Sequence, residues 1–109
     1  MTRVYSALLG WGDGITDGPI GIVPAGELWV VRHITALCFA VSSEPLEGFD
    51  ITWGDGYPIW STPDLGLCSK VTYDWAGRHA FPAGTTITLM SRDGNGWNVT
   101  MSGYSLTTP

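Results

Sequence analysis

Glycine and proline interrupt this sequence so often that few long helices can form. The 109 residues include 15 Gly and 7 Pro, and both types are unfavourable inside a helix because glycine costs backbone entropy and proline removes a hydrogen-bond donor. The longest interval without either residue, 27–44, is rich in β-branched and aromatic residues, which pack well on a pleated sheet. The sequence therefore predicts an all-β protein.

The alternation of apolar and polar residues locates the strands. Segments 49–53 and 85–91 alternate with a period of two, which is typical of strands with one buried face. In segment 67–75 the same period directs Val71, Tyr73 and Trp75 towards the core. In segment 97–106 the apolar phase changes by one residue around Gly103, which suggests a β-bulge or bend there and a backbone role for this glycine.

The positions of glycine, proline, asparagine and aspartate predict three kinds of turn. The run 93–96, Asp-Gly-Asn-Gly, tolerates positive φ, so we expect 85–91 and 97–106 to form a hairpin. Pro-Ala-Gly occurs at 24–26 and at 82–84, each time after an apolar residue and before a strand, which predicts the same turn twice. Trp-Gly-Asp-Gly also occurs twice. The spacing between its two copies differs from the spacing between the two Pro-Ala-Gly copies, so both are turn sequences that occur twice rather than units of a tandem repeat.

Seven or eight short strands predict a single small antiparallel β-sandwich, jelly-roll-like, over residues 1–109. The chain is long enough for one hydrophobic core but not for two. We expect the first twenty residues, 1–20, to contribute an N-terminal strand or arm that packs on a neighbouring subunit.

The long strand expected over 27–41 is apolar on both faces. One face carries Leu28, Val30 and Ile34 among others, although a sandwich leaves one face of each strand to water. The excess apolar surface suggests that a second copy of the chain covers it, or that the loop 44–48 folds over it. The candidate interface or anchor residues, on the other face, are Trp29, Val31, Leu37 and Phe39.

Charge excludes several partners. The formal net charge is −5, and the five Lys and Arg residues are scattered along the chain, whereas nucleic-acid binding needs clustered cations. No stretch has the length and apolarity of a transmembrane helix, so we expect no membrane insertion. Residues 1–9 run directly into Gly10 and Trp11 and do not have the pattern of a secretory signal, so we expect folding in the cytoplasm.

The sequence contains no complete motif for catalysis or metal binding. There is no nucleophile elbow and no paired spacing of Cys and His for zinc, so we expect no metal, no cofactor and no catalysis. Cys38 and Cys68 are expected to be free thiols. Arg32 and His33 point to opposite faces of one strand, so one of them needs a polar partner, for which Asp50 and Asp74 are the candidates. A small hydrolase with a carboxylate pair is the least favoured class.

Six tryptophans in so short a chain support two interpretations. Trp side chains fill small cores and subunit interfaces. Aromatic faces beside turns also stack on sugar rings, with nearby Asp groups to bind hydroxyls, as in a carbohydrate-binding module. The candidate glycan or partner contacts are Trp11, Trp53, Trp60 and Trp97.

Three groups of residues along the chain form one combined pattern. They are Val-Pro-Ala-Gly at 23–26 followed by Val-Val-Arg at 30–32, Gly-Arg at 77–78 followed by Ala-Gly at 83–84, and Ser-Gly-Tyr-Ser-Leu at 102–106. In combination, over nearly the whole chain, they resemble small virion proteins of tailed phages, often found in actinobacterial phages. The Trp-rich segment 51–60 and the Trp-Gly-Asp-Gly turns are departures from that pattern, and they leave a receptor or glycan contact open.

The resemblance implies a non-enzymatic structural subunit, either a minor tail protein or a head decoration. The partners it implies are copies of the same chain and other virion proteins, and the protein would fold in the host cytoplasm before assembly into the virion. The alternative is a carbohydrate-binding module or a receptor-binding adhesin that contacts a host surface glycan through surface Trp residues.

Overall fold

Eight strands form the described part of the chain. The computed structural model describes residues 7–39, 48–62, 70–92 and 96–107. The strands are β1 (Ala7–Ile15), β2 (Asp17–Ile22), β3 (Glu27–Phe39), β4 (Phe49–Trp53), β5 (Tyr57–Ser61), β6 (Lys70–Phe81), β7 (Thr86–Ser91) and β8 (Trp97–Thr107). These ranges contain no helix, and the prediction of an all-β protein is confirmed.

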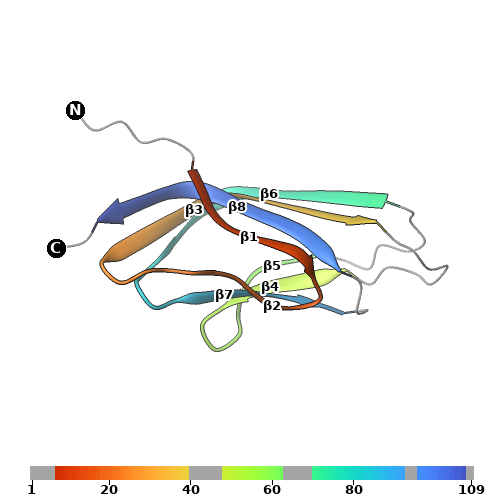
Figure 1. Cartoon of the computed structure of the whole chain (residues 1–109), viewed down its shortest axis with the longest axis horizontal. Helices are drawn as coiled ribbons and strands as arrows, with labels where there is room; N and C mark the ends of the chain where they lie inside the picture. The colour runs from red at the N-terminus through yellow and green to blue at the C-terminus, as the bar shows by residue number, and fades with distance from the viewer. Residues whose placement is uncertain (1–6, 40–47, 63–69, 93–95, 108–109) are drawn as a thin grey trace.

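The strands form two antiparallel sheets of four strands, one above the other in Figure 1. The order is β1-β8-β3-β6 in the first, here called the β8–β3 sheet, and β2-β7-β4-β5 in the second, the β7–β4 sheet. Strand β1 therefore pairs with β8, β2 with β7, β3 with β6 and β4 with β5. This is one long hairpin rolled into two layers, the arrangement of a jelly roll, and it confirms the predicted jelly-roll-like sandwich.

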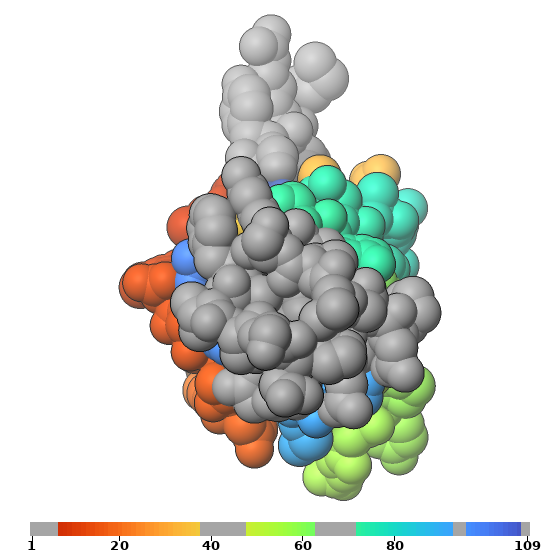
Figure 2. Space-filling model, turned by 90° about the vertical axis from the view of Figure 1, so that its right-hand side faces the viewer, coloured from red at the N-terminus to blue at the C-terminus, as the bar shows by residue number. Residues whose placement is uncertain are grey.

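The described residues of the expected N-terminal arm lie in the chain's own sandwich. Strand β1 pairs with β8 and β2 pairs with β7, and the chain changes sheets at Thr16, whose carbonyl accepts a 2.8 Å hydrogen bond from the Ser91 N–H. Residues 1–6 of that arm are outside the described residues. In the end view of Figure 2, the red and orange residues of β1 and β2 lie on one side, opposite β6 in teal and β4–β5 in green.

The predicted hairpin between 85–91 and 97–106 is wrong. Strand β7 lies between β2 and β4, and β8 lies between β1 and β3, so neither has a free edge for the other. Leu89 and Trp97 are both buried in the shared core, which they reach from opposite layers. Alternation and turn residues fit a crossover as well as a hairpin, because they do not specify which sheet the next strand joins.

The two Pro-Ala-Gly triplets form the same turn, as predicted. Gly26 and Gly84 have φ of 79° and 85°, and in each turn the residue after the glycine donates a 3.2 Å backbone hydrogen bond to the proline carbonyl. A glycine with positive φ in third position is typical of a type II turn. The turns also bind each other, since Val23 accepts from Gly84 and donates to Thr85. They are adjacent because they join β2 to β3 and β6 to β7, which pair in the roll.

A bulge at Arg32 reverses the two faces of β3. The register of β3 against β8 skips Arg32, and the register against β6 is irregular at the same place. The Arg32 Nε donates a 2.9 Å hydrogen bond to the Gly77 carbonyl on β6. Before the bulge Val31 is buried in the core, and after it Ile34 is. Trp29, Val31, Ile34 and Ala36 therefore share the inner face. Leu28, Val30 and Leu37 lie on the outer face, which stays partly apolar.

The bulge was predicted at Gly103 on β8, but the extra residue is Arg32 on β3. Strand β8 pairs residue by residue with β3 on each side of the skipped Arg32, and Tyr104 and Leu106 pair with Val30 and Leu28 on the outer face. The phase change in the sequence marks a transfer of apolar residues from the inner to the outer face. Gly103 itself has the backbone role expected of it, because a Cβ there would overlap the Val30 carbonyl.

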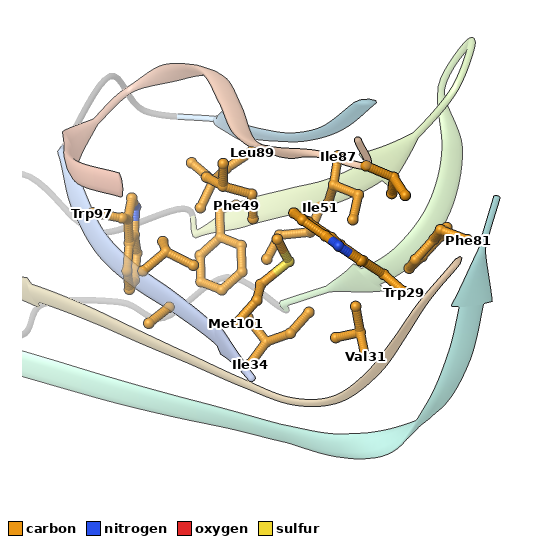
Figure 3. Packing of buried hydrophobic residues seen from close by; sticks show 14 residues of the cluster. Trp29, Val31, Ile34, Phe49, Ile51, Phe81, Ile87, Leu89, Trp97 and Met101 are labelled. Carbon is orange, nitrogen blue, oxygen red and sulfur yellow. The ribbon is translucent and has the colours of Figure 1, made fainter. Parts of the chain in front are cut away.

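The core lies between the sheets and is aromatic at its centre (Figure 3). The Phe49 ring contacts Trp97 edge to face, with centroids 4.6 Å apart at 67°. Trp97 is 0% exposed, and in the described part of the chain its Nε1 has no hydrogen-bond partner. Met101 and Ile34 of the β8–β3 sheet face Leu89 and its neighbours across this cluster.

Candidate functional site

The outer face of the β8–β3 sheet carries a row of side chains that crosses all four strands. Trp11 of β1 is opposite Thr100 of β8, Thr100 is opposite Thr35 of β3, and Thr35 is opposite Asp74 of β6. Opposed residues in antiparallel strands share a face, so these four point away from the core. The Thr35 hydroxyl donates a 2.8 Å hydrogen bond to the Asp74 carboxylate, which orders this end of the row.

A groove of about 510 Å³ lies on this outer face, and we call it the Trp11 groove. Its volume is within the range of small-molecule sites, roughly 300–1,000 Å³. Trp11 is 64% exposed, the highest exposure among the large hydrophobic side chains of the described residues. The side chains that line the groove are Leu8, Trp11 and Asp13 of β1, Asn98 and Thr100 of β8, and Thr35 and Leu37 of β3.

Polar groups with unused hydrogen-bonding capacity lie beside the Trp11 indole. The Oδ1 of Asn98 accepts a 2.8 Å hydrogen bond from the Gly14 N–H, so its Nδ2 is directed elsewhere. Within the described residues, that Nδ2, the Thr100 hydroxyl and the Asp13 carboxylate have no protein partner. The groove therefore combines an exposed aromatic surface with free donors and acceptors.

Sequence reasoning identified Trp11 as a surface contact and Leu37 as an anchor, but it did not identify Asn98 and Thr100. Asn98 and Thr100 alternate along β8 with the buried Trp97 and Val99. That alternation was the sequence signal that Asn98 and Thr100 point outward. Their proximity to Trp11 depends on β8 pairing with β1, two strands that are far apart in sequence. The predicted hairpin placed β8 beside β7 and gave no indication of this proximity.

A second, apolar surface lies on the same outer face, on the other side of the Arg32 bulge. Leu106 is opposite Leu28, while Val30 is flanked by Tyr104 and Ala80 on the adjacent strands. Leu106 is 42% exposed, and Val30 is buried although it points outward. We call these five residues the Leu106 patch.

The other three candidate glycan contacts are less accessible than Trp11. Trp53 and Trp60 are half-buried at the side of the sandwich formed by β5 and β6. The Trp60 ring lies 4.9 Å from Phe49 and 6.3 Å from Tyr73 by centroid distance, so it closes the edge of the core. The prediction for Trp97 is corrected, because its complete burial leaves no face on which a sugar could stack.

The four candidate anchors do not share one face. Trp29 and Val31 lie in the core between the sheets. Leu37 lies beyond the bulge and faces the Trp11 groove instead. The side chain of Phe39 is outside the described residues, as are the side chains of Cys38 and Cys68. The grouping was wrong for Leu37 because an uninterrupted period of two does not account for the extra residue at Arg32.

Of the two acidic candidates, Asp74 is the partner of His33. The His33 Nε2 is 3.3 Å from the Asp74 Oδ1, and both side chains are at least half exposed. Ser102 is opposite His33 on the outer face, and Asp74 lies in the adjacent row, so the residue types of a catalytic triad lie near one another. In the described structure no hydrogen bond joins Ser102 to His33, and Asp74 is shared with Thr35, so these residues lack the linked geometry of a triad.

Asp50 instead pairs with Arg92, 2.8 Å away. The Arg92 guanidinium also donates to the carbonyls of Phe49 and Thr62. These contacts join the beginning of β4 to the end of β5 and make Arg92 a structural clamp.

No group of three His, Cys, Asp or Glu in the described ranges is arranged to hold a metal ion. A membrane-crossing helix is likewise absent from those ranges. No protein-family model matches the chain, and no curated protein matches it either. What the molecule can do must therefore be inferred from its surface, and among the described residues the Trp11 groove and the Leu106 patch carry the argument.

Proposed function

We propose that this protein is a non-enzymatic structural subunit of a bacteriophage virion that acts through contacts between copies of itself and with other virion proteins. The observation that carries the proposal is the Leu106 patch, an apolar group on the outer face of a sheet whose inner face already packs the core. Contiguous apolar surface of this kind is typical of protein interfaces.

Two further features support a virion role. The residue groups at 23–32, 77–84 and 102–106 resemble small tailed-phage virion proteins. All three take part in close backbone contacts here, the first two in the paired turns and the third through the approach of Gly103 to the Val30 carbonyl. Jelly rolls also recur in viral capsid proteins, which supports the role by analogy of fold. Head and tail positions are equally compatible with these features.

The oligomeric mass tests the proposed self-association. We expect light scattering at micromolar concentration to give a multiple of 11.7 kDa, and the double variant Leu28→Ser/Leu106→Ser to give the monomer mass while remaining folded. Ile22→Ser/Met90→Ser, on the outer face of the other sheet, is the matched control and keeps the wild-type mass. A monomeric wild-type protein, or a folded double variant with unchanged mass, contradicts the proposal.

The virion location needs its own measurement. We expect the chain to be present in purified particles of the phage whose genome encodes it, and a gold-labelled antibody to mark the head or the tail. Particles that lack the chain would exclude a structural role in the virion.

A further inference from the structure

We propose that the Trp11 groove binds an uncharged glycan, with one sugar ring stacked on the Trp11 indole. This goes beyond the virion role and does not depend on it, because it rests on a different part of the outer face. Three properties of the groove favour a sugar over other ligands.

The first property is an exposed aromatic face held by a rigid strand. Trp11 is 64% exposed and is fixed on β1 by pairing with Thr100 on β8. A Trp side chain presents a large apolar face at low entropic cost and takes part readily in stacking. The C–H face of a pyranose matches such a surface, and the exposed Leu8 extends it along the same strand.

The second property is the set of free polar groups at the edge of that face. The Asn98 Nδ2 can donate, the Asp13 carboxylate can accept, and the Thr100 hydroxyl can do either. Vicinal sugar hydroxyls each donate and accept, so they suit this mixture of groups. A purely apolar partner, such as the Leu106 patch of a second copy, would bury the same groups without partners at a cost.

The third property is charge. Among the described residues, the groove is lined by one carboxylate, that of Asp13, and by no Lys or Arg, and Asp74 lies at the end of the row that contains Trp11. Phosphate, sulfate or sialic acid would meet repulsion here rather than a cation. The ligand class is therefore a neutral hexose or N-acetylhexosamine glycan.

The probe is an array of uncharged hexose and N-acetylhexosamine oligosaccharides, printed beside sialylated and sulfated ones. We expect the wild-type protein to bind one or more uncharged glycans, and calorimetric titration with the strongest of them to give a measurable affinity. Trp11→Ala is expected to weaken that affinity by about tenfold or more, the loss of one aromatic stacking contact. Asp13→Ala should weaken it too, and Thr100→Phe should fill the groove while Trp11 itself is retained.

The matched control is Tyr57→Ala, which removes another exposed aromatic ring at the far side of the sandwich and should leave binding unchanged. Each variant is checked for a native circular dichroism spectrum, which is expected because the three groove positions are exposed. The proposal is overturned if no uncharged glycan binds, if only anionic glycans bind, or if folded Trp11→Ala and Thr100→Phe both bind as the wild type does.

The same variants separate this proposal from the proposed function. If Trp11→Ala lowers the oligomeric mass and no glycan binds, the groove is an interface between copies, and the glycan proposal fails while self-association stands. If the wild-type protein is a monomer that binds a glycan through Trp11, the glycan proposal stands and self-association fails.

Discussion

The Trp11 groove and the Leu106 patch lie on the same face of the same sheet, yet they differ in chemistry. The groove combines an exposed indole with free amide, hydroxyl and carboxylate groups. The patch is almost entirely apolar and contains Val30, which is buried although it points outward. The two are separated by the irregular line at Arg32, where β3 gains a residue relative to β8.

The difference shows how one inserted residue decides which side chains form the outer surface. Without the bulge, Val30 and Leu28 would share the inner face with Ile34 and Ala36, and Trp29 and Val31 would lie outside in their place. With the bulge, Leu28 and Val30 before Arg32 lie on the outer face. After Arg32 the outer face carries the more polar His33 and Thr35.

The largest expected effect comes from Gly103, which lies directly at the bulge. We expect Gly103→Ala to destabilise the fold by about 4–5 kcal/mol or more, because the new Cβ overlaps the Val30 carbonyl and cannot be relieved by a side-chain rotation. Both surfaces would be lost together, since a domain of this size is stable by only about 5–15 kcal/mol. Thermal unfolding measures the change. Gly18→Ala is the control, with open space around the added methyl group, and an equal effect there would refute the explanation.

A smaller but still large difference is expected between two tryptophans. Trp97→Ala empties the centre of the core and should cost about 3–5 kcal/mol. Trp11→Ala removes an exposed side chain and should change the unfolding free energy by less than about 0.5 kcal/mol. Denaturant titration compares them. Similar costs would mean that Trp11 is packed against something, such as a second copy, in the native protein.

The smallest of the three differences between a variant and its comparison variant is expected at Thr35, which links the groove to Asp74. Thr35→Val keeps the shape but removes the donor to the Asp74 carboxylate, and should cost about 0.5–1.5 kcal/mol. It also makes this row more like the Leu106 patch, so glycan binding should weaken. Thr88→Val, on the outer face of the other sheet, is the comparison variant and should be near neutral in unfolding experiments. A Thr35→Val protein of unchanged stability would show that the hydrogen bond adds nothing.

Much of the local structure could be predicted from the residues. Alternation at 49–53 and 85–91 located β4 and β7 and their inner faces, because side chains alternate with a period of two wherever a strand forms. The Pro-Ala-Gly turns were predictable because the third position of a type II turn needs positive φ, which glycine adopts without strain.

The candidate site was less predictable than the fold. Trp11 was proposed as a surface contact because it lies beside Gly and Asp residues, but Trp97 has the same kind of neighbours and is completely buried. The difference between them is the direction of the side chain, inward on β8 and outward on β1. For Trp97 the shared phase with Val99 and Met101 was a local signal of an inward direction, whereas no such phase surrounds Trp11, whose direction depends on which strands pair.

By itself, the sequence determined that this chain is all-β, where most strands lie and which turns need glycine, because these depend on residues close to one another in the chain. The tertiary structure alone decided that β7 and β8 join different sheets, that β3 changes faces at Arg32, and that Trp11 meets Asn98 and Thr100. Each of these depends on hydrogen bonds between residues far apart in sequence, whose formation is decided by the packing of both sheets on a common core.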